Sequence, residues 1–147
     1  TRQNLPVIDR TKYPSAFNLE KGAYILWQSK QGEPDVILIG SGSEVSLALN
    51  AAHELSAECN VRVVSMPSWE LFDKQDEIYR SKVLPAACKA RLAIEAGISM
   101  GWKKYVGTNG CTLCIDHFGK SAPYKMLEKQ FGFTVENVIS IVRNLLS

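Results

Sequence analysis

Short apolar runs alternate along this chain with amphipathic stretches, which is the pattern of strands followed by helices. Five runs are short enough to be strands, and they cover residues 23–28, 36–39, 61–64, 91–95 and 111–115. The second run is apolar at every position, as in a strand of a parallel sheet that helices cover on both faces. The sequence therefore predicts a sheet whose central strands are buried.

Helical spacing of apolar residues predicts the elements between these strands. Residues 43–58 form the longest such stretch, and another begins after Thr134, whose hydroxyl can cap the first turn. Residues 70–90 predict short helix broken at Pro85, and residues 123–131 predict a further helix. We therefore expect an α/β fold, a three-layer sandwich with a mostly parallel five-stranded sheet and helices on both faces.

The first 21 residues show no sustained hydrophobic period. They carry Pro6 and Pro14 and mix charges with single apolar residues, which is typical of a connecting or wrapping arm. The chain opens on Thr1 and not on Met, as a processed protein or a piece of a longer one would. We expect the arm to need another surface to lie against.

Composition and charge narrow the classes of partner. With 147 residues and 46% apolar composition, the chain is the size of one domain with one core. Its 17 basic and 15 acidic residues are scattered, so we expect neither nucleic acid nor a membrane surface as a partner. Four irregularly spaced cysteines are too few for a secreted disulfide framework. We expect an intracellular, cytoplasmic protein.

Two glycines after the second strand suggest a phosphate-binding turn. A dinucleotide fingerprint needs a third small residue and a carboxylate about 20 positions on. Gly40 and Gly42 fit, but Val45 stands at the third position, and residues 65–68 offer no carboxylate. No Gly-Lys-Ser or Gly-Lys-Thr stands at the end of this turn, so a Walker loop fits less well still.

A capping box explains the same turn without a ligand. In the Ser41-x-x-Glu44 spacing, the hydroxyl and the carboxylate can each bond a free backbone N–H at the start of the helix. We therefore favour a structural turn. The alternative is an anion- or nucleotide-binding regulatory module, whose site would comprise Gly40, Ser41, Gly42 and Ser43.

Other reactive residues do not assemble into a catalytic or metal site. Cys111 and Cys114 have the spacing of a redox or zinc pair, but strand formers surround them, and His117 would be only a third ligand. We expect buried or half-buried cysteines that act as small hydrophobes. Asp116 beside His117 predicts a turn, and a lone His53 predicts a boundary residue. We expect no catalytic residue and no metal ligand set in this chain.

Seven motifs follow one another in order over nearly the full length of the chain. They are TRQNLP at Thr1, GSEVSLAL from Gly42, VRVVSMPSWELFDKQ from Val61, VLP at Val83, EAGISMGWKKYVG from Glu95, DHFGKSAP from Asp116 and FGFTVENV from Phe131. Together they resemble the C-terminal domain of a transketolase. Transketolases move a two-carbon ketol unit between sugar phosphates, with thiamine diphosphate and a divalent cation, Mg or Ca. Their cofactor sits between the first two domains, across a homodimer interface.

The resemblance implies a role without chemistry of its own. Residues 1–21 would be the linker arm from the preceding pyrimidine-binding domain, and residues 22–147 would be the C-terminal domain. This domain packs against the remaining transketolase domains and adds homodimer contacts, and alone it would be inactive and hold no cofactor. The arginine that contacts the sugar phosphate in the family matches Arg2.

Large aromatic rings cluster near the predicted loops. They are Trp69, Phe72, Trp102, Tyr105 and Phe118. Such rings either close the ends of the core or form an apolar patch for another domain or subunit. The transketolase hypothesis favours an exposed apolar surface near Trp69 and Trp102.

Overall fold

A five-stranded sheet with the order β1-β3-β2-β4-β5 forms the centre of the structure, a computed structural model that describes residues 7–116 and 132–147. The strands are β1 (Tyr24–Gln28), β2 (Val36–Gly40), β3 (Val61–Ser65), β4 (Ala90–Glu95) and β5 (Cys111–Cys114). β1 runs antiparallel to β3, whereas the other neighbouring pairs are parallel. The predicted fold class is confirmed.

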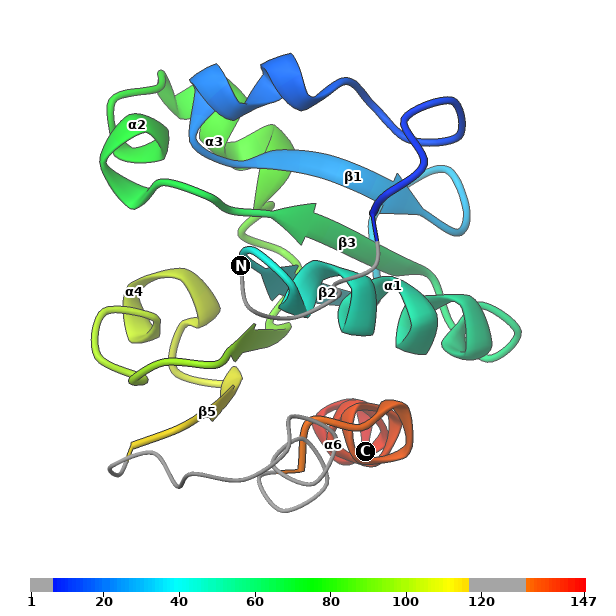
Figure 1. Ribbon diagram of the computed structural model, residues 1–147. Coiled ribbons are helices and arrows are strands. Elements are labelled where there is room, and N and C mark those ends of the chain that lie inside the picture. The colour runs from blue at the N-terminus through cyan, green and yellow to red at the C-terminus, as the bar shows by residue number, and fades with distance from the viewer. Residues whose placement is uncertain (1–6, 117–131) are drawn as a thin grey trace.

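The helices form layers on both faces of this sheet. They are η1 (Ala16–Lys21), α1 (Glu44–Leu55), α2 (Trp69–Asp73), α3 (Glu77–Val83), α4 (Lys103–Val106) and α6 (Val135–Leu146). α1 and α6 lie against each other over one face (Figure 1). Side chains of α2, α3 and α4 pack over the other face. None of these described helices is both long enough and apolar enough to span a membrane.

β2 is covered from both sides, as its uninterrupted apolar run predicts. All five of its residues are buried. Val36 and Leu38 belong to the core cluster beneath α1 and α6, while Ile37 and Ile39 belong to the cluster beneath α2, α3 and α4. Successive strand side chains point to opposite faces, so one strand supplies both cores.

Most predicted elements are present, with ends that shift by a few residues. The helix predicted over 43–58 ends at Leu55, where the amides of Glu58 and Cys59 both bond the Leu55 carbonyl. The broken helix of 70–90 is the pair α2 and α3, but the break lies between Asp73 and Glu77 and not at Pro85. α3 stops before Pro85 because the preceding Leu84 adopts a non-helical backbone, φ −123° and ψ 74°. The helix predicted over 123–131 lies outside the described residues.

Two arginines bind the backbone carbonyls around the end of α3. Arg62 on β3 and Arg91 on β4 both pair with Ile37 of the intervening strand, so they share one register. Arg62 donates to the carbonyls of Lys82 and Val83, and Arg91 donates to those of Leu84 and Pro85. The guanidinium groups thereby satisfy carbonyls that a helix end leaves unpaired.

The described part of the arm lies against the domain. Tyr13 and Ile8 pack on the core cluster beneath α1, and the Tyr13 hydroxyl hydrogen-bonds to His53 at 3.0 Å. η1 follows, with the Ser15 hydroxyl accepting from Phe17 N–H at its start. Gly22 then brings the chain into contact with α2, because its carbonyl accepts from Ser68 N–H at 3.0 Å.

Replacing Gly22 by Ala should destabilise the domain far more than the same change at Gly32. Both glycines have positive φ, but a Cβ at Gly22 would lie 2.2 Å from Phe72 N, whereas nothing lies within 4 Å of one at Gly32. We expect Gly22→Ala to cost more than about 3 kcal/mol and Gly32→Ala about 1 kcal/mol. Thermal unfolding measures both, at about 2–4 °C per kcal/mol. Equal losses would contradict the packing of the arm on α2.

Candidate functional site

The carboxyl ends of β2 and β4 meet where the winding of the sheet reverses. The chain passes from β2 through α1 to β3 on one side, and then returns across β2 to β4 on the other. Open α/β sheets bind their ligands in the crevice at such a reversal. The turn from Gly40 to Ser43 lies at this edge, beside Glu95 at the end of β4.

Backbone geometry explains why glycine occupies both positions of this turn. A Cβ at Gly40 would lie 3.2 Å from Val45 N and 3.3 Å from the Glu44 carbonyl carbon, so glycine allows α1 to begin close to the strand. Gly42 has φ +53°. Left-handed backbone of this kind favours glycine. Neither feature requires a ligand.

Both hydroxyls of the turn are engaged by carboxylates. Ser41 Oγ donates to Glu95 Oε2 at 2.5 Å, and Ser43 Oγ donates to Glu44 Oε1 at 2.7 Å. The predicted capping box is wrong, because the N-cap is Ser43, its side chain makes no capping bond, and the Ser41 hydroxyl is directed to β4. An incoming anion would compete with carboxylates for these donors.

An apolar pocket adjoins this turn. It has a volume of about 450 Å³ and is lined by Trp69, Glu95, Gly97, Ile98, Met100, Gly101 and Trp102. Ile98 and Met100 are 59% and 76% exposed. Two large, exposed apolar side chains beside a pocket form the kind of surface that contacts another domain or subunit.

The aromatic rings close the core beneath this pocket. Trp69 and Trp102 meet edge to face at 5.1 Å, and Trp102 is buried. Tyr105 is buried as well, and its hydroxyl donates to Asp73 at 3.2 Å. Burial and Asp73 raise the pKa of Tyr105 well above its usual range. The exposed part of the predicted apolar surface therefore comprises Ile98 and Met100, and not Trp102.

The candidate reactive residues that the sequence suggests do not come together in the described structure. Residues 7–116 and 132–147 contain no group of three metal-ligating side chains. His53 is exposed and lies against Trp27, with ring centroids 4.5 Å apart, as expected of a boundary residue. Asp116 accepts from Ser99 N–H at 2.7 Å, a contact between distant residues that does not test the predicted turn. Arg2, His117 and Phe118 lie outside the described residues.

Cys111 and Cys114 differ in their surroundings. Cys114 is half-buried against the core, as expected, whereas Cys111 is exposed, so that part of the prediction is wrong. Burial, Asp116 and Glu95 raise the pKa of Cys114 to about 11. A redox thiol requires the opposite shift.

Sequence reasoning missed the bond between Ser41 and Glu95, which joins residues 54 positions apart. A signal was available, since Glu95 is the polar residue that ends an apolar strand beside the glycine turn. Parallel strands bring such end residues to one edge.

Comparison with known proteins yields one consistent family. A model of the transketolase-like TK C-terminal domain matches residues 22–134. The transketolases of Bacillus subtilis and Escherichia coli are 51% and 49% identical to the chain over 100% and 99% of its length. A Pichia stipitis transketolase structure in complex with sedoheptulose-7-phosphate aligns with a TM-score of 0.85, at 34% identity over 99% of the chain. A Leishmania mexicana transketolase aligns with a TM-score of 0.81, at 43% identity over 88%.

These relatives are much longer than the chain. It spans 22% of the Bacillus subtilis and Escherichia coli proteins, 20% of the Pichia stipitis chain and 18% of the Leishmania mexicana chain.

The two cysteines of β5 should differ in their rates of alkylation. At pH 8 only about a thousandth of Cys114 is thiolate, because its pKa is about 11. We expect iodoacetamide to modify Cys111 first and to spare Cys114, Cys59 and Cys88 until urea is added, as mass spectrometry of the peptides can measure. Equal rates at Cys111 and Cys114, or a disulfide between them under mild oxidation, would contradict this account.

Proposed function

The chain belongs to the family of transketolase-like C-terminal domains, and on this premise we propose that it is the structural C-terminal domain of a transketolase. The observation that carries the proposal is about 50% identity to curated transketolases over the whole chain. The parent would be a transferase that moves a two-carbon ketol unit between sugar phosphates inside the cell. The complex of the Pichia stipitis relative with sedoheptulose-7-phosphate supports this substrate class.

The reaction centre would lie in the domains that this chain does not include. Thiamine diphosphate with Mg or Ca would supply the nucleophilic carbon there. The described carboxyl edge offers hydroxyls already engaged by carboxylates, and its described residues contain no metal-ligating group. This chain would therefore contribute packing to the reaction and not a proton or a ligand.

The pocket beside the glycine turn would be a contact surface of the assembled homodimer. Ile98 and Met100 are exposed there, while the rings beneath them are fixed by edge-to-face packing. A rigid apolar surface loses little conformational entropy when another domain covers it. We assign this edge to contacts with the remaining transketolase domains or the second subunit.

The arm would join this domain to the preceding pyrimidine-binding domain. In this proposal residues 1–21 form the linker and residues 22–147 form the C-terminal domain. Arg2, at the far end of the arm, would bind the phosphate of the sugar substrate in the assembled enzyme. A guanidinium group can donate to two phosphate oxygens at once, which suits this task.

A regulatory anion or nucleotide site at Gly40, Ser41, Gly42 and Ser43 is the weaker alternative. The two hydroxyls that would face the anion donate instead to Glu95 and Glu44. Carboxylates at a helix N-terminus also take the favourable interaction with its dipole that an anion would need.

Arg2→Gln in the full-length parent should impair the use of phosphorylated substrates. Loss of a bidentate charge-assisted contact is worth about 2–3 kcal/mol, so we expect kcat/KM to fall about 30- to 150-fold, mostly through KM. Arg10→Gln is the matched control, because Arg10 lies in the same arm and, among the described residues, bonds only to Pro14 and Tyr24. Steady-state kinetics should show less than a twofold change for Arg10→Gln. Equal effects of the two changes would refute the role of Arg2.

A further inference from the structure

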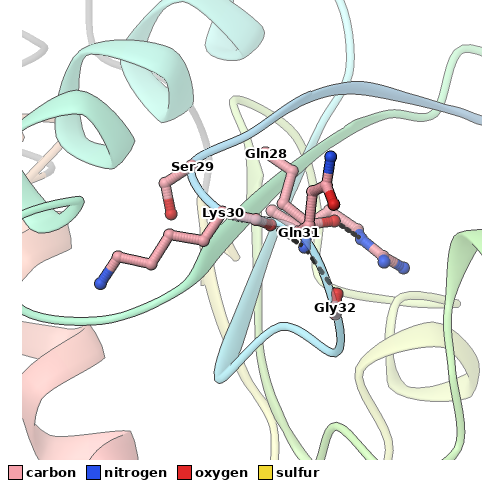
Figure 2. A pocket seen from close by; sticks show the side chains of 6 residues that line it. Gln28, Ser29, Lys30, Gln31 and Gly32 are labelled. Atoms are coloured by element: carbon pink, nitrogen blue, oxygen red, sulfur yellow. Dashed lines mark hydrogen bonds between the residues drawn. The ribbon is translucent and has the colours of Figure 1, made fainter.

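A second pocket opens at the amino edge of the parallel strands, away from the glycine turn. It has a volume of about 440 Å³ and is lined by residues 28–32, which follow β1, together with Arg62 of β3 (Figure 2). Nothing in the proposed transketolase role uses this pocket. Its charge and its hydrogen-bond donors nevertheless indicate a ligand.

Arg62 supplies an unusual buried cation to this pocket. The residue is only 7% exposed. Its Nε donates to Gln28 Oε1 at 2.8 Å, and Nη1 donates to the Lys82 and Val83 carbonyls at 2.8 and 3.1 Å. A guanidinium group carries five N–H donors, two of them on Nη2. Among residues 7–116 and 132–147, no group accepts a hydrogen bond from Nη2 of Arg62.

That nitrogen must reach the surface. Every fully buried side-chain nitrogen or oxygen in the described structure has a hydrogen-bond partner, so an unpartnered Nη2 has access to solvent. Arg62 lines only this pocket of the two at the sheet edges. The free donors of the guanidinium group are therefore available there.

Arg91 provides a comparison within the same molecule. It shares the register of Arg62, but its Nε bonds the Cys88 carbonyl, Nη1 bonds the Tyr105 carbonyl, and Nη2 bonds the Leu84 and Pro85 carbonyls. Arg91 is thus engaged through all three nitrogens. Arg62 keeps one nitrogen that bonds to none of the described residues.

Among the residues that the structure describes, the positive charge of Arg62 has no direct counter-ion. The ion pairs of the described residues are Lys12–Asp9, Lys104–Asp73 and Arg143–Glu58, and none involves Arg62. Glu33 acts on Arg62 only through space, and burial lowers the pKa of the guanidinium group. A buried cation of this kind is unfavourable unless an anion accompanies it.

The wall of the pocket is held in place before any ligand arrives. The Gln28 side chain donates to the Lys30 and Gly32 carbonyls at 2.7 and 2.8 Å, and the Lys30 amide donates to Asn60 Oδ1 at 3.1 Å. Figure 2 shows the Gln28 amide bridging the loop, while the side chains of Lys30 and Gln31 extend from it in different directions. Preorganised donors lose little entropy on binding.

We propose that this pocket binds a small oxyanion, a phosphate or a carboxylate, through Nη2 of Arg62. The Gln31 side chain supplies an adjustable donor, and Lys30 adds attraction from its exposed ammonium group. The charge of the guanidinium group strengthens a hydrogen bond from Nη2 to either oxyanion. The site is independent of the proposed transketolase role, because it uses the opposite edge of the sheet.

The test is an NMR titration of the 147-residue chain with sodium phosphate and, separately, with sodium acetate, at constant ionic strength set by chloride. We expect saturable shifts of the backbone amides of residues 28–32 and of the Arg62 Nε–H signal, with dissociation constants on the order of millimolar. Tighter binding of phosphate would identify a phosphate site, and tighter binding of acetate a carboxylate site. Absence of saturable shifts in both titrations up to 50 mM, a concentration about tenfold above that range, would overturn the proposal.

Variants that should change the affinity for the anion in opposite directions make the test more specific. Lys30→Ala should weaken binding and Glu33→Gln should tighten it, each about two- to threefold, because both side chains are exposed and act through screened charge. Lys74→Ala, at an exposed position on the far edge, is the matched control and should change nothing. Arg62→Lys should weaken binding at least about tenfold, since a single ammonium group cannot keep the bonds to Gln28 and the α3 carbonyls and also donate into the pocket.

Arg62 also holds the end of α3, so Arg62→Lys could unfold the domain. Its binding data can be interpreted only if its NMR spectrum is dispersed, as in a folded protein. If that variant does not fold, Lys30→Ala and Glu33→Gln decide the matter. Affinities that change in the same direction in both variants, or as much in Lys74→Ala, would overturn the proposal.

Discussion

Burial of β2 on all sides is the constraint on which this structure depends. Helices cover both of its faces, and the parallel strands β3 and β4 flank it. A strand in this position must be apolar at successive residues, and it fixes the register of its neighbours. Ile37 thus determines that Arg62 and Arg91 lie opposite each other across it. Gly40, at the other end of the strand, determines where the glycine turn begins.

The two edges of the sheet consequently differ in charge. At the carboxyl edge, Glu44 and Glu95 accept hydrogen bonds from the turn that leads into α1. At the amino edge, Arg62 and Arg91 donate to carbonyls around the end of α3. Each charge has the sign that the adjacent helix end favours. This arrangement explains how a nearly neutral chain presents an edge unsuited to phosphate and an opposite edge suited to it.

Local patterns predicted the strands and both long helices, because burial in or against a sheet requires apolar residues at regular spacing along the sequence. The same patterns failed at the capping box, where Ser41 bonds a residue from a distant strand, and at Cys111, whose exposure depends on its position at the edge strand β5. Arg62 stands within an apolar run, and nothing local distinguishes a buried arginine there from an exposed one. Arg2 was named through resemblance alone and lies outside the described residues.

Hydrogen–deuterium exchange of the isolated chain and of the full-length parent tests the central claim most directly. In the proposed assembly, the carboxyl edge is a contact surface and the chemistry lies in other domains. We expect amides of residues 96–102 to exchange at least about tenfold more slowly in the parent, and those of residues 28–32 to exchange equally in both. Equal exchange of residues 96–102 in the two proteins would contradict it, because the exposed Ile98 and Met100 would then remain uncovered in the assembled enzyme.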